Sequence, residues 1–193
     1  MLAACGAWYG RFMLGLQHDV NRLVAYDPDW PHAFAQEAAA LRQALGARVR
    51  GLEHYGSTSV PGLCAKPILD ILLGVAPLED WAACRAPLQR LGYDYVADAG
   101  IEGHHIFGRG RDAGERTHLL HIVAFGETEW NLNLAMRDAL RRDPELRAAY
   151  AAEKARAAAA APTGRAAYNA LKGPFILRVR ERLRQPHPGA VPG

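Results

Sequence analysis

The stretch "HYGSTSVPGLCAKPILDILLGV", residues 54–75, decides the fold that we expect for this chain. It opens with a turn of small residues over 56–59 and continues into an apolar segment that contains one carboxylate, Asp70. A segment that is apolar on both faces is typical of a central strand covered by helices. The backbone N–H groups and hydroxyls of the turn suit phosphate oxygens. The stretch predicts either a phosphate-holding turn beside a functional acid, or a tight turn that packs small residues before a buried strand.

Asp70 is the sharpest single signal in this stretch. Burying a carboxylate among isoleucine and leucine residues is costly unless it is paired, hydrogen-bonded or bound to a metal ion. Because side chains alternate along a strand, Asp70 is expected on the same face as Ile68 and Leu72. Two interpretations remain open: a carboxylate that backbone N–H groups or an arginine satisfy, or one that holds a metal ion or a ligand.

The rest of the chain places this stretch in an α+β domain. Apolar periodicity and turn residues predict helices over 27–46 and 79–91, with Asp29 as the cap of the first. They predict strands over 48–56, 68–75, 93–97, 104–108 and 117–124, and three helical segments after residue 128. This order favours a mixed sheet flanked by helices, with a C-terminal helical block. We expect residues 1–20 to be an N-terminal extension (Met13 is an alternative start), 21–185 one domain and 186–193 a flexible tail.

Composition limits the function classes. The chain has 193 residues, half of them hydrophobic, and a net charge of +3, which is ordinary for one globular domain. It shows no basic stripe with interleaved aromatic residues and no membrane-length apolar run, so we expect neither nucleic-acid nor membrane partners. Its three cysteines have no paired spacing, which fits the reduced cytoplasm in which we expect this protein. Only Lys66, Lys154 and Lys172 are lysines among 23 basic residues, which marks them as candidates for positions that need a compact ammonium group.

Segments spread along the chain resemble one family. They are "LVAYDPDWPHAF", "LEHYGSTSVPGLCAKPILDILLGV", "LGYDYV", "THLLHIV", "MRDALRRDPELRAAY" and "YNALKGPFI", in this order over about 23–177. This pattern resembles the GrpB family, which has a nucleotidyltransferase-like fold and also occurs fused to dephospho-CoA kinase. The resemblance implies a nucleotide or another phosphorylated small molecule as the ligand, and an enzyme of the CoA pathway as a candidate partner.

The resemblance also implies roles for particular residues. In nucleotidyltransferases the Gly-Ser turn holds nucleotide phosphates, and two strand carboxylates hold divalent metal ions. Here the second carboxylate position is Leu72, whereas His121 in "THLLHIV" lies where a third acid often stands. Asp70 and His121 would then hold one Mg²⁺, Mn²⁺ or Zn²⁺ ion, and imidazole suits the last two better. The alternative is that His121 is hydrogen-bonded to Asp70 in a polar core network. Regular alternation puts His118 on the opposite face, away from His121.

Two further cations are expected at the rim of the same site. Arg109 ends a predicted strand and is suited to bind a phosphate or carboxylate in a bidentate manner; the alternative is an exposed loop cation. Lys172 lies four residues after Tyr168, so both share a helical face that would close over the sheet. The alternative for this pair is helix-to-sheet packing with a solvated ammonium group.

These observations lead to one functional hypothesis and two alternatives. The first is nucleotidyl or phosphoryl transfer with one metal ion, in which Asp70 and His121 are the catalytic and metal-binding residues. The residues expected to bind phosphate are Gly56, Ser57, Thr58, Lys66, Arg109 and Lys172. The first alternative is a non-catalytic module that binds a ligand or a partner on a degenerate nucleotidyltransferase fold. The second is a metal-dependent reaction on a small molecule without a nucleotide.

Overall fold

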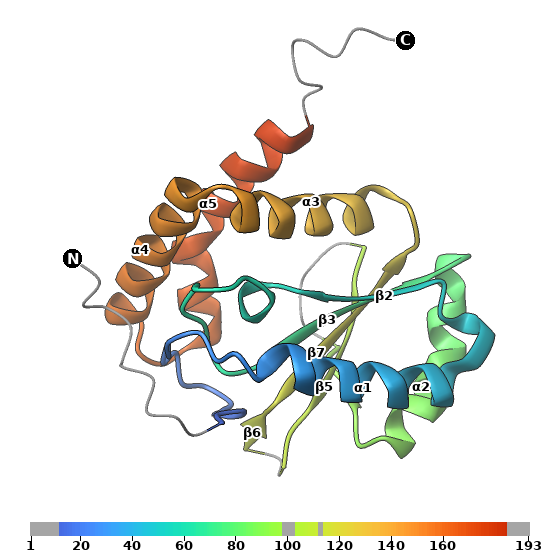
Figure 1. The fold of residues 1–193 in the computed structure, drawn as a ribbon. Helices are drawn as coiled ribbons and strands as arrows, with labels where there is room; N and C mark the ends of the chain where they lie inside the picture. The colour runs from blue at the N-terminus through green and yellow to red at the C-terminus, as the bar shows by residue number, and fades with distance from the viewer. Residues whose placement is uncertain (1–11, 98–102, 112–113, 185–193) are drawn as a thin grey trace, which may run out of the picture.

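The computed structural model describes residues 12–97, 103–111 and 114–184. Within these residues the chain forms a mixed five-stranded sheet in the order β2-β3-β7-β5-β4 (Figure 1). The strands are β2 (Gly51–Tyr55), β3 (Leu69–Val75), β7 (His118–Ala124), β5 (His105–Arg109) and β4 (Asp94–Tyr95). Strands β3 and β7 are parallel, and the other neighbouring pairs are antiparallel. The stretch that contains Asp70 is thus next to the centre of the sheet, as the sequence predicts.

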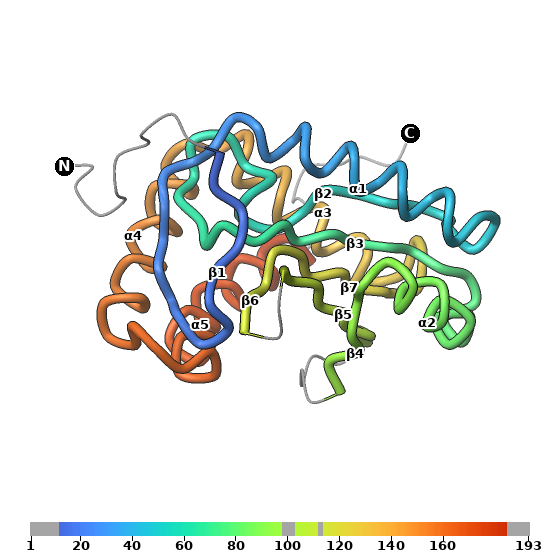
Figure 2. The backbone as a smooth tube through the Cα atoms, turned by 90° about the horizontal axis from the view of Figure 1, so that it is seen from below, coloured from blue at the N-terminus to red at the C-terminus, as the bar shows by residue number. Residues whose placement is uncertain are grey.

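Helices cover both faces of this sheet (Figures 1 and 2). Helices α1 (Trp30–Leu45) and α2 (Trp81–Arg90) cover one face. Helix α3 (Thr128–Arg142) crosses the other, and α4 (Pro144–Ala160) and α5 (Arg165–Arg184) pack beside it as a C-terminal block. The predicted α+β architecture, a mixed sheet flanked by helices with a C-terminal helical block, is confirmed.

The two faces of the sheet have different cores. Toward α1 and α2 the core is broad and apolar, and it includes Leu41, Ile71 and Phe107. Toward α3 it is narrow and centres on Trp130. The indole fits there because two glycines, Gly51 and Gly74, stand opposite each other in β2 and β3. A Cβ atom at Gly51 would lie 2.4 Å from the Trp130 ring.

Aspartates lie at the starts of helices α1 and α4. Asp29 occupies the N-cap position of α1, as predicted, but its side chain makes no capping hydrogen bond. In the turn just before the helix, the carboxylate of Asp27 accepts a hydrogen bond from the Asp29 N–H at 2.9 Å. At α4 the carboxylate of Asp143 accepts from two backbone N–H groups just after Pro144.

The described part of the expected N-terminal extension pairs with the body of the fold. Strand β1 (Leu16–Gln17) pairs antiparallel with β6 (Glu115–Arg116), and the two lie side by side in Figure 2. Val20 then forms a bridge to Thr163, just before α5. Residues 16–20 therefore tie β6, which forms a separate two-stranded sheet with β1, to the segment just before α5. The expected start and tail, residues 1–11 and 186–193, lie outside the described residues.

None of the helices within the described ranges combines the length and the hydropathy needed to cross a membrane.

Candidate functional site

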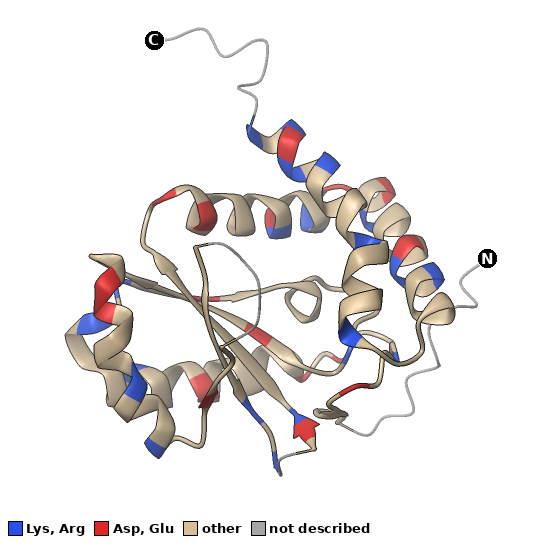
Figure 3. Cartoon of the chain, turned by 180° about the vertical axis from the view of Figure 1, so that it is seen from behind, with Lys and Arg blue, Asp and Glu red and all other residues tan. Residues whose placement is uncertain are grey.

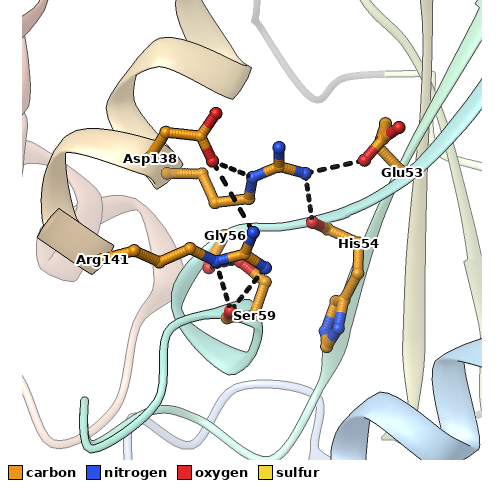
Figure 4. A network of polar contacts seen from close by, with 7 residues as sticks. Glu53, His54, Gly56, Ser59, Asp138 and Arg141 are labelled. Atoms are coloured by element: carbon orange, nitrogen blue, oxygen red, sulfur yellow. Dashed lines mark hydrogen bonds and ion pairs between the residues drawn. The ribbon is translucent and has the colours of Figure 1, made fainter.

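The Gly-Ser turn leaves β2 and returns the chain toward β3. Gly56 has a φ of +67°, and Ser57–Ser59 form a single 3-10 turn. Two arginines of α3 bind backbone carbonyls of this turn and of the end of β2, and Figure 4 shows the contact of Arg141 with Ser59. Arg141 donates two hydrogen bonds to the Ser59 carbonyl, at 2.8 and 3.0 Å, and Arg137 donates to the His54 carbonyl at 3.1 Å. These guanidinium groups fix the shape of the turn through its backbone.

Gly56 also makes room for Asp70. Tyr55 is the register partner of Asp70, so the turn begins beside the carboxylate. A Cβ atom at position 56 would lie 2.4 Å from Oδ2 of Asp70. Glycine is therefore required twice, for its positive φ and for the close approach of the carboxylate.

A pocket of about 490 Å³ opens in front of Asp70. It lies between the turn, the strands β3 and β7, and the helices α3 to α5. All three lysines of the chain line this pocket: Lys66, Lys154 and Lys172. This placement agrees with the sequence argument that the few lysines occupy special positions.

Lys154 is the most deeply buried of the three lysines. Its side chain is 2% exposed, and Nζ donates hydrogen bonds to Ser57 Oγ at 2.9 Å and to the Cys64 carbonyl. Both acceptors are neutral, so the ammonium group has no ion-pair partner among the described residues. Burial, followed by repulsion from Lys172, lowers the pKa of Lys154 well below its ordinary value.

Lys66 and Lys172 share one aromatic ring. The Nζ atoms lie 4.2 Å and 4.9 Å from the centroid of the Tyr168 ring, within the range of a cation–π contact. Lys66 also donates a hydrogen bond to Asn21 Oδ1. Burial, with repulsion from Lys172 and Arg165, lowers the pKa of Lys66 to about 8. Burial likewise lowers the pKa of Lys172. The positive charges of the side chains that line the pocket therefore destabilise one another.

Asp70 faces these cations without a direct partner. No described residue donates a hydrogen bond or forms an ion pair to its carboxylate, so the predicted pairing with backbone N–H groups or an arginine is not seen. Burial raises the pKa of Asp70 to about 6, although Lys172, Arg165 and Lys154 all lower it. The carboxylate is therefore half-buried, open to the pocket and surrounded by positive charge.

His121 lies on the pocket side of β7, and His118 lies on the opposite side, as alternation predicts. Strand register places His121 beside Leu72 and places Leu119 beside Asp70. The predicted hydrogen bond between His121 and Asp70 is not seen. His121 instead contacts His104, with 3.1 Å between the two Nδ1 atoms.

The residues around Asp70 do not fit a divalent cation. No group of three or more His, Cys, Asp or Glu side chains in the described ranges is arranged to hold a metal ion. Three ammonium groups and the guanidinium of Arg165 act on Asp70, and they would repel a metal ion at this position. The predicted single-metal site at Asp70 and His121 therefore lacks a suitable donor set.

Two predicted phosphate-binding residues lie away from the pocket. Arg109 pairs in register with His118 and forms an ion pair with Glu37 of α1, on the opposite face of the sheet. The predicted position of Arg109 at the rim is therefore not seen, because its place in the sheet directs the side chain toward α1. Thr58 is buried, and its hydroxyl lies 3.0 Å from Nε2 of His54, also toward α1. The turn therefore offers Gly56 and Ser57 to the pocket, but not Thr58.

Three further residues that line the pocket were not predicted from the sequence: Arg165, His104 and Arg180. Arg165 was not selected, although it lies seven residues before Lys172 and hence on the same face of α5. Helical spacing from Tyr168 and Lys172 was the signal that could have found it. His104 and Arg180 carry no comparable signal, because β5 and the distal half of α5 reach the pocket only in the folded chain.

Comparison with known proteins places this geometry in a family. The model of the family described as "GrpB protein" matches residues 21–182. The chain belongs to the GrpB family. It is 39% identical over 163 residues to the UPF0157 protein PA4798 of Pseudomonas aeruginosa, which covers 81% of this chain and 64% of that protein. The crystal structure of the conserved protein GrpB from Enterococcus faecalis matches with a TM-score of 0.72 and 33% identity, over 84% of this chain and 99% of that one.

The GrpB relationship extends to a longer enzyme. A dephospho-CoA kinase of Mycolicibacterium paratuberculosis is 30% identical over 180 residues, which cover 80% of this chain and 44% of the kinase. This match supports the predicted occurrence of GrpB domains fused to dephospho-CoA kinase. The chain spans 64% of the Pseudomonas protein and less than half of this kinase.

Proposed function

We propose that this GrpB protein binds a nucleotide or another phosphorylated small molecule in the pocket at Asp70. Four cations would hold the phosphate: Lys66, Lys154, Lys172 and Arg165. The observation that carries the proposal is a charge imbalance. These cations line the pocket without an ion pair, whereas Asp70 is the only carboxylate among the described residues that line it.

The remaining cations of the pocket are already neutralised. Each of three further arginines that line it has an acidic partner, at 2.6 to 2.8 Å: Arg116 with Asp94, Arg137 with Glu53 and Arg180 with Glu129. The four unpaired cations therefore stand out against a background in which charges are matched. An anionic ligand would supply the missing negative charge, and the partly buried position of these cations would strengthen the attraction.

Several features favour a phosphate over a single carboxylate. Four cations exceed what one negative charge needs, whereas a phosphate chain carries several charges. Ser57, already hydrogen-bonded to Lys154, offers a hydroxyl beside the turn. The volume of about 490 Å³ lies in the range of small-molecule sites, and Tyr150 and Tyr168 add aromatic surface to it. The kinase relative makes CoA and dephospho-CoA specific candidates, and a CoA-pathway enzyme remains the predicted partner.

The same charges favour binding over metal-dependent transfer. Leu72 replaces the second carboxylate, and the cations around Asp70 oppose a metal ion. Nucleotidyl or phosphoryl transfer with Asp70 and His121 as metal ligands stays a prediction. If the transfer hypothesis holds, removal of metal ions by a chelator should abolish ligand binding. The proposed binding site, in contrast, should bind its ligand without a metal ion.

The test is a thermal-melting series on the full chain. Inorganic phosphate, nucleoside triphosphates, CoA and dephospho-CoA are added singly, with Mg²⁺, Mn²⁺, Zn²⁺ or EDTA. A ligand at about 100 times its dissociation constant adds about 2.7 kcal/mol, which raises Tm by several degrees in a chain of this size. We expect such a shift with a phosphorylated ligand in EDTA.

Matched variants locate the shift. Lys172→Met is expected to reduce it strongly, whereas Arg182→Met, which removes one exposed positive charge from the distal end of α5, is expected to leave it unchanged. No shift with any phosphorylated compound would overturn the proposal. A shift that appears only with a metal ion would favour the transfer hypothesis instead.

A further inference from the structure

A chain of polar contacts that the proposed phosphate grip does not use ends at His121. Arg180 of α5 donates two hydrogen bonds to the Glu129 carboxylate, at 2.6 and 2.8 Å. Glu129 of α3 lies 3.0 Å from Nε2 of His104, and Nδ1 of His104 lies 3.1 Å from Nδ1 of His121. Three of these residues line the pocket: Arg180, His104 and His121. The contacts thus link the C-terminal block to the sheet through partly and fully buried side chains.

The chemistry of the groups fixes where each proton lies. Arg180 and His104 lower the pKa of Glu129, so the carboxylate is ionised and only accepts hydrogen bonds. Nε2 of His104 must then carry a proton and donate it. In a neutral imidazole the other nitrogen is an acceptor, so Nδ1 of His104 accepts from Nδ1–H of His121. This leaves Nε2 of His121 without a proton.

The surroundings keep both rings neutral. Burial lowers the pKa of His104, against the opposing effect of Glu129, and Arg180 lowers it further. Burial also lowers the pKa of His121 well below its ordinary value, and the positive charges of Arg165 and Lys172 act in the same direction. The ring of Tyr55 packs against His121 in an edge-to-face arrangement, with 5.3 Å between the ring centroids, and adds an uncharged neighbour.

The free nitrogen of His121 is open to the pocket. Nδ1 is occupied by His104, and no described residue forms a hydrogen bond to Nε2. Among the described residues, Nε of Arg116 is the only fully buried side-chain nitrogen or oxygen atom that has no hydrogen-bond partner. Nε2 of His121 has no such partner either, so it is not fully buried, and it is accessible from the pocket that this ring lines.

We propose that Arg180, Glu129 and His104 are positioning residues that hold His121 in one tautomer, with an unprotonated Nε2 presented to the pocket. His121 then accepts a hydrogen bond from a hydroxyl group of the bound ligand, in the orientation that a general base requires. The ligand class is thereby narrowed to a phosphorylated compound that also carries a free hydroxyl group. The tautomer follows from the protein alone, and only the ligand part rests on the proposed function.

The test reads the protons directly. Histidine labelled with nitrogen-15 in the full chain gives long-range proton–nitrogen correlation spectra near neutral pH, and spectra of His104→Asn and His121→Asn assign the two rings. We expect His121 to carry its proton on Nδ1 and His104 to carry its proton on Nε2. A proton on Nε2 of His121 in the wild-type chain would overturn the proposal.

A pair of variants tests the role of the carboxylate. Glu129→Gln removes the charge that fixes His104, and we expect His121 to become a mixture of tautomers. Glu127→Gln removes the same charge from an exposed position two residues away, and the wild-type pattern should persist. An unchanged His121 in Glu129→Gln would show that Glu129 does not position it and would overturn the chain of contacts.

The ligand part is tested separately, so the two failures are distinguishable. If the expected tautomer is found and no phosphorylated compound binds, the proposed function fails and the positioning of His121 stands. If a phosphorylated ligand binds, its analogue without hydroxyl groups should bind at least several-fold more weakly, and this difference should disappear in His121→Asn. Equal binding of the two compounds to the wild-type chain would overturn the ligand part.

Discussion

The two faces of the central sheet carry buried charges in opposite states. Toward α1, Glu37 forms an ion pair with Arg109, accepts a hydrogen bond from the Tyr93 hydroxyl at 2.9 Å and lies 3.9 Å from His118. Toward α5, the lysines and Asp70 have no ion-pair partner in the part of the chain that the structure describes, and they surround a pocket. One cluster is closed and balanced, whereas the other is open and carries excess positive charge.

The difference separates a structural role from a binding role. A paired, buried charge is held by its partner, and its loss leaves that partner unsatisfied. An unpaired, buried charge lowers the stability of the ligand-free fold, and a bound ligand of opposite charge offsets this cost. The comparison therefore predicts opposite effects of substitutions on the two faces.

The largest effect is expected on the closed face. Glu37→Ala leaves the guanidinium of Arg109 and the hydroxyl of Tyr93 without their acceptor. The free energy of unfolding should fall by about 3 kcal/mol, because one partner of a buried pair is removed. Urea denaturation measures the change. A loss below about 0.5 kcal/mol, the range of ordinary surface substitutions, would show that this cluster is not a structural pair.

On the open face, Lys154→Met should separate stability from binding. The substitution removes a buried ammonium group that has only neutral acceptors, so Tm without ligand should rise. The affinity for the phosphorylated ligand should fall about 100-fold, since a hydrogen bond to a charged group contributes up to about 3 kcal/mol. Calorimetric titration and melting together give both values. A fall in Tm with unchanged affinity would place Lys154 in the structural class.

Two glycines test how closely Asp70 packs against the turn. Both have a positive φ, +67° at Gly56 and +77° at Gly62, but only a Cβ at Gly56 would contact Asp70. Gly62→Ala should lower the free energy of unfolding by about 1 kcal/mol, from the backbone alone. Gly56→Ala should cost about 2 kcal/mol because the carboxylate must also move. Equal losses in denaturation experiments would mean that the close approach carries no energy.

The smallest effect concerns the pH dependence of stability. The raised pKa of Asp70, about 6, means that the folded chain binds more protons than the unfolded chain between about pH 4 and pH 6. The contribution of this group to stability therefore falls as the pH rises through that window. Two pKa units correspond to about 3 kcal/mol for a fully enclosed group. Because this carboxylate is open to the pocket, solvent screening reduces the effect. Asp70→Asn should be more stable than the wild type by about 1 kcal/mol at neutral pH, with the difference lost near pH 4. A variant less stable at neutral pH would show that the carboxylate is favourably bound.

Local patterns predicted much of the candidate site. Alternation along β3 and β7 placed Asp70 and His121 on one face and His118 on the other, because side chains on a strand follow a period of two residues. Helical spacing placed Tyr168 and Lys172 together on α5. The scarcity of lysine indicated Lys66, Lys154 and Lys172, which all line the pocket.

The errors fall where long-range contacts decide the direction of a side chain. Arg109 ends its strand as predicted, but its partner Glu37 lies 72 residues earlier in the chain, on a helix that covers the other face. The contacts of His121 come from His104 on an antiparallel neighbour and, through it, from α3 and α5. No local sequence pattern predicts these contacts between distant segments.

The sequence by itself determined the elements, the faces of the strands and the glycine turn beside Asp70. These depend on steric limits and on periodicities of a few residues, which a short segment carries within itself. Only the tertiary structure decided which charges are paired, because pairing depends on the distance between segments far apart in the chain. That distinction, between the balanced cluster at Glu37 and the unbalanced pocket at Asp70, is what locates the candidate binding site in this protein.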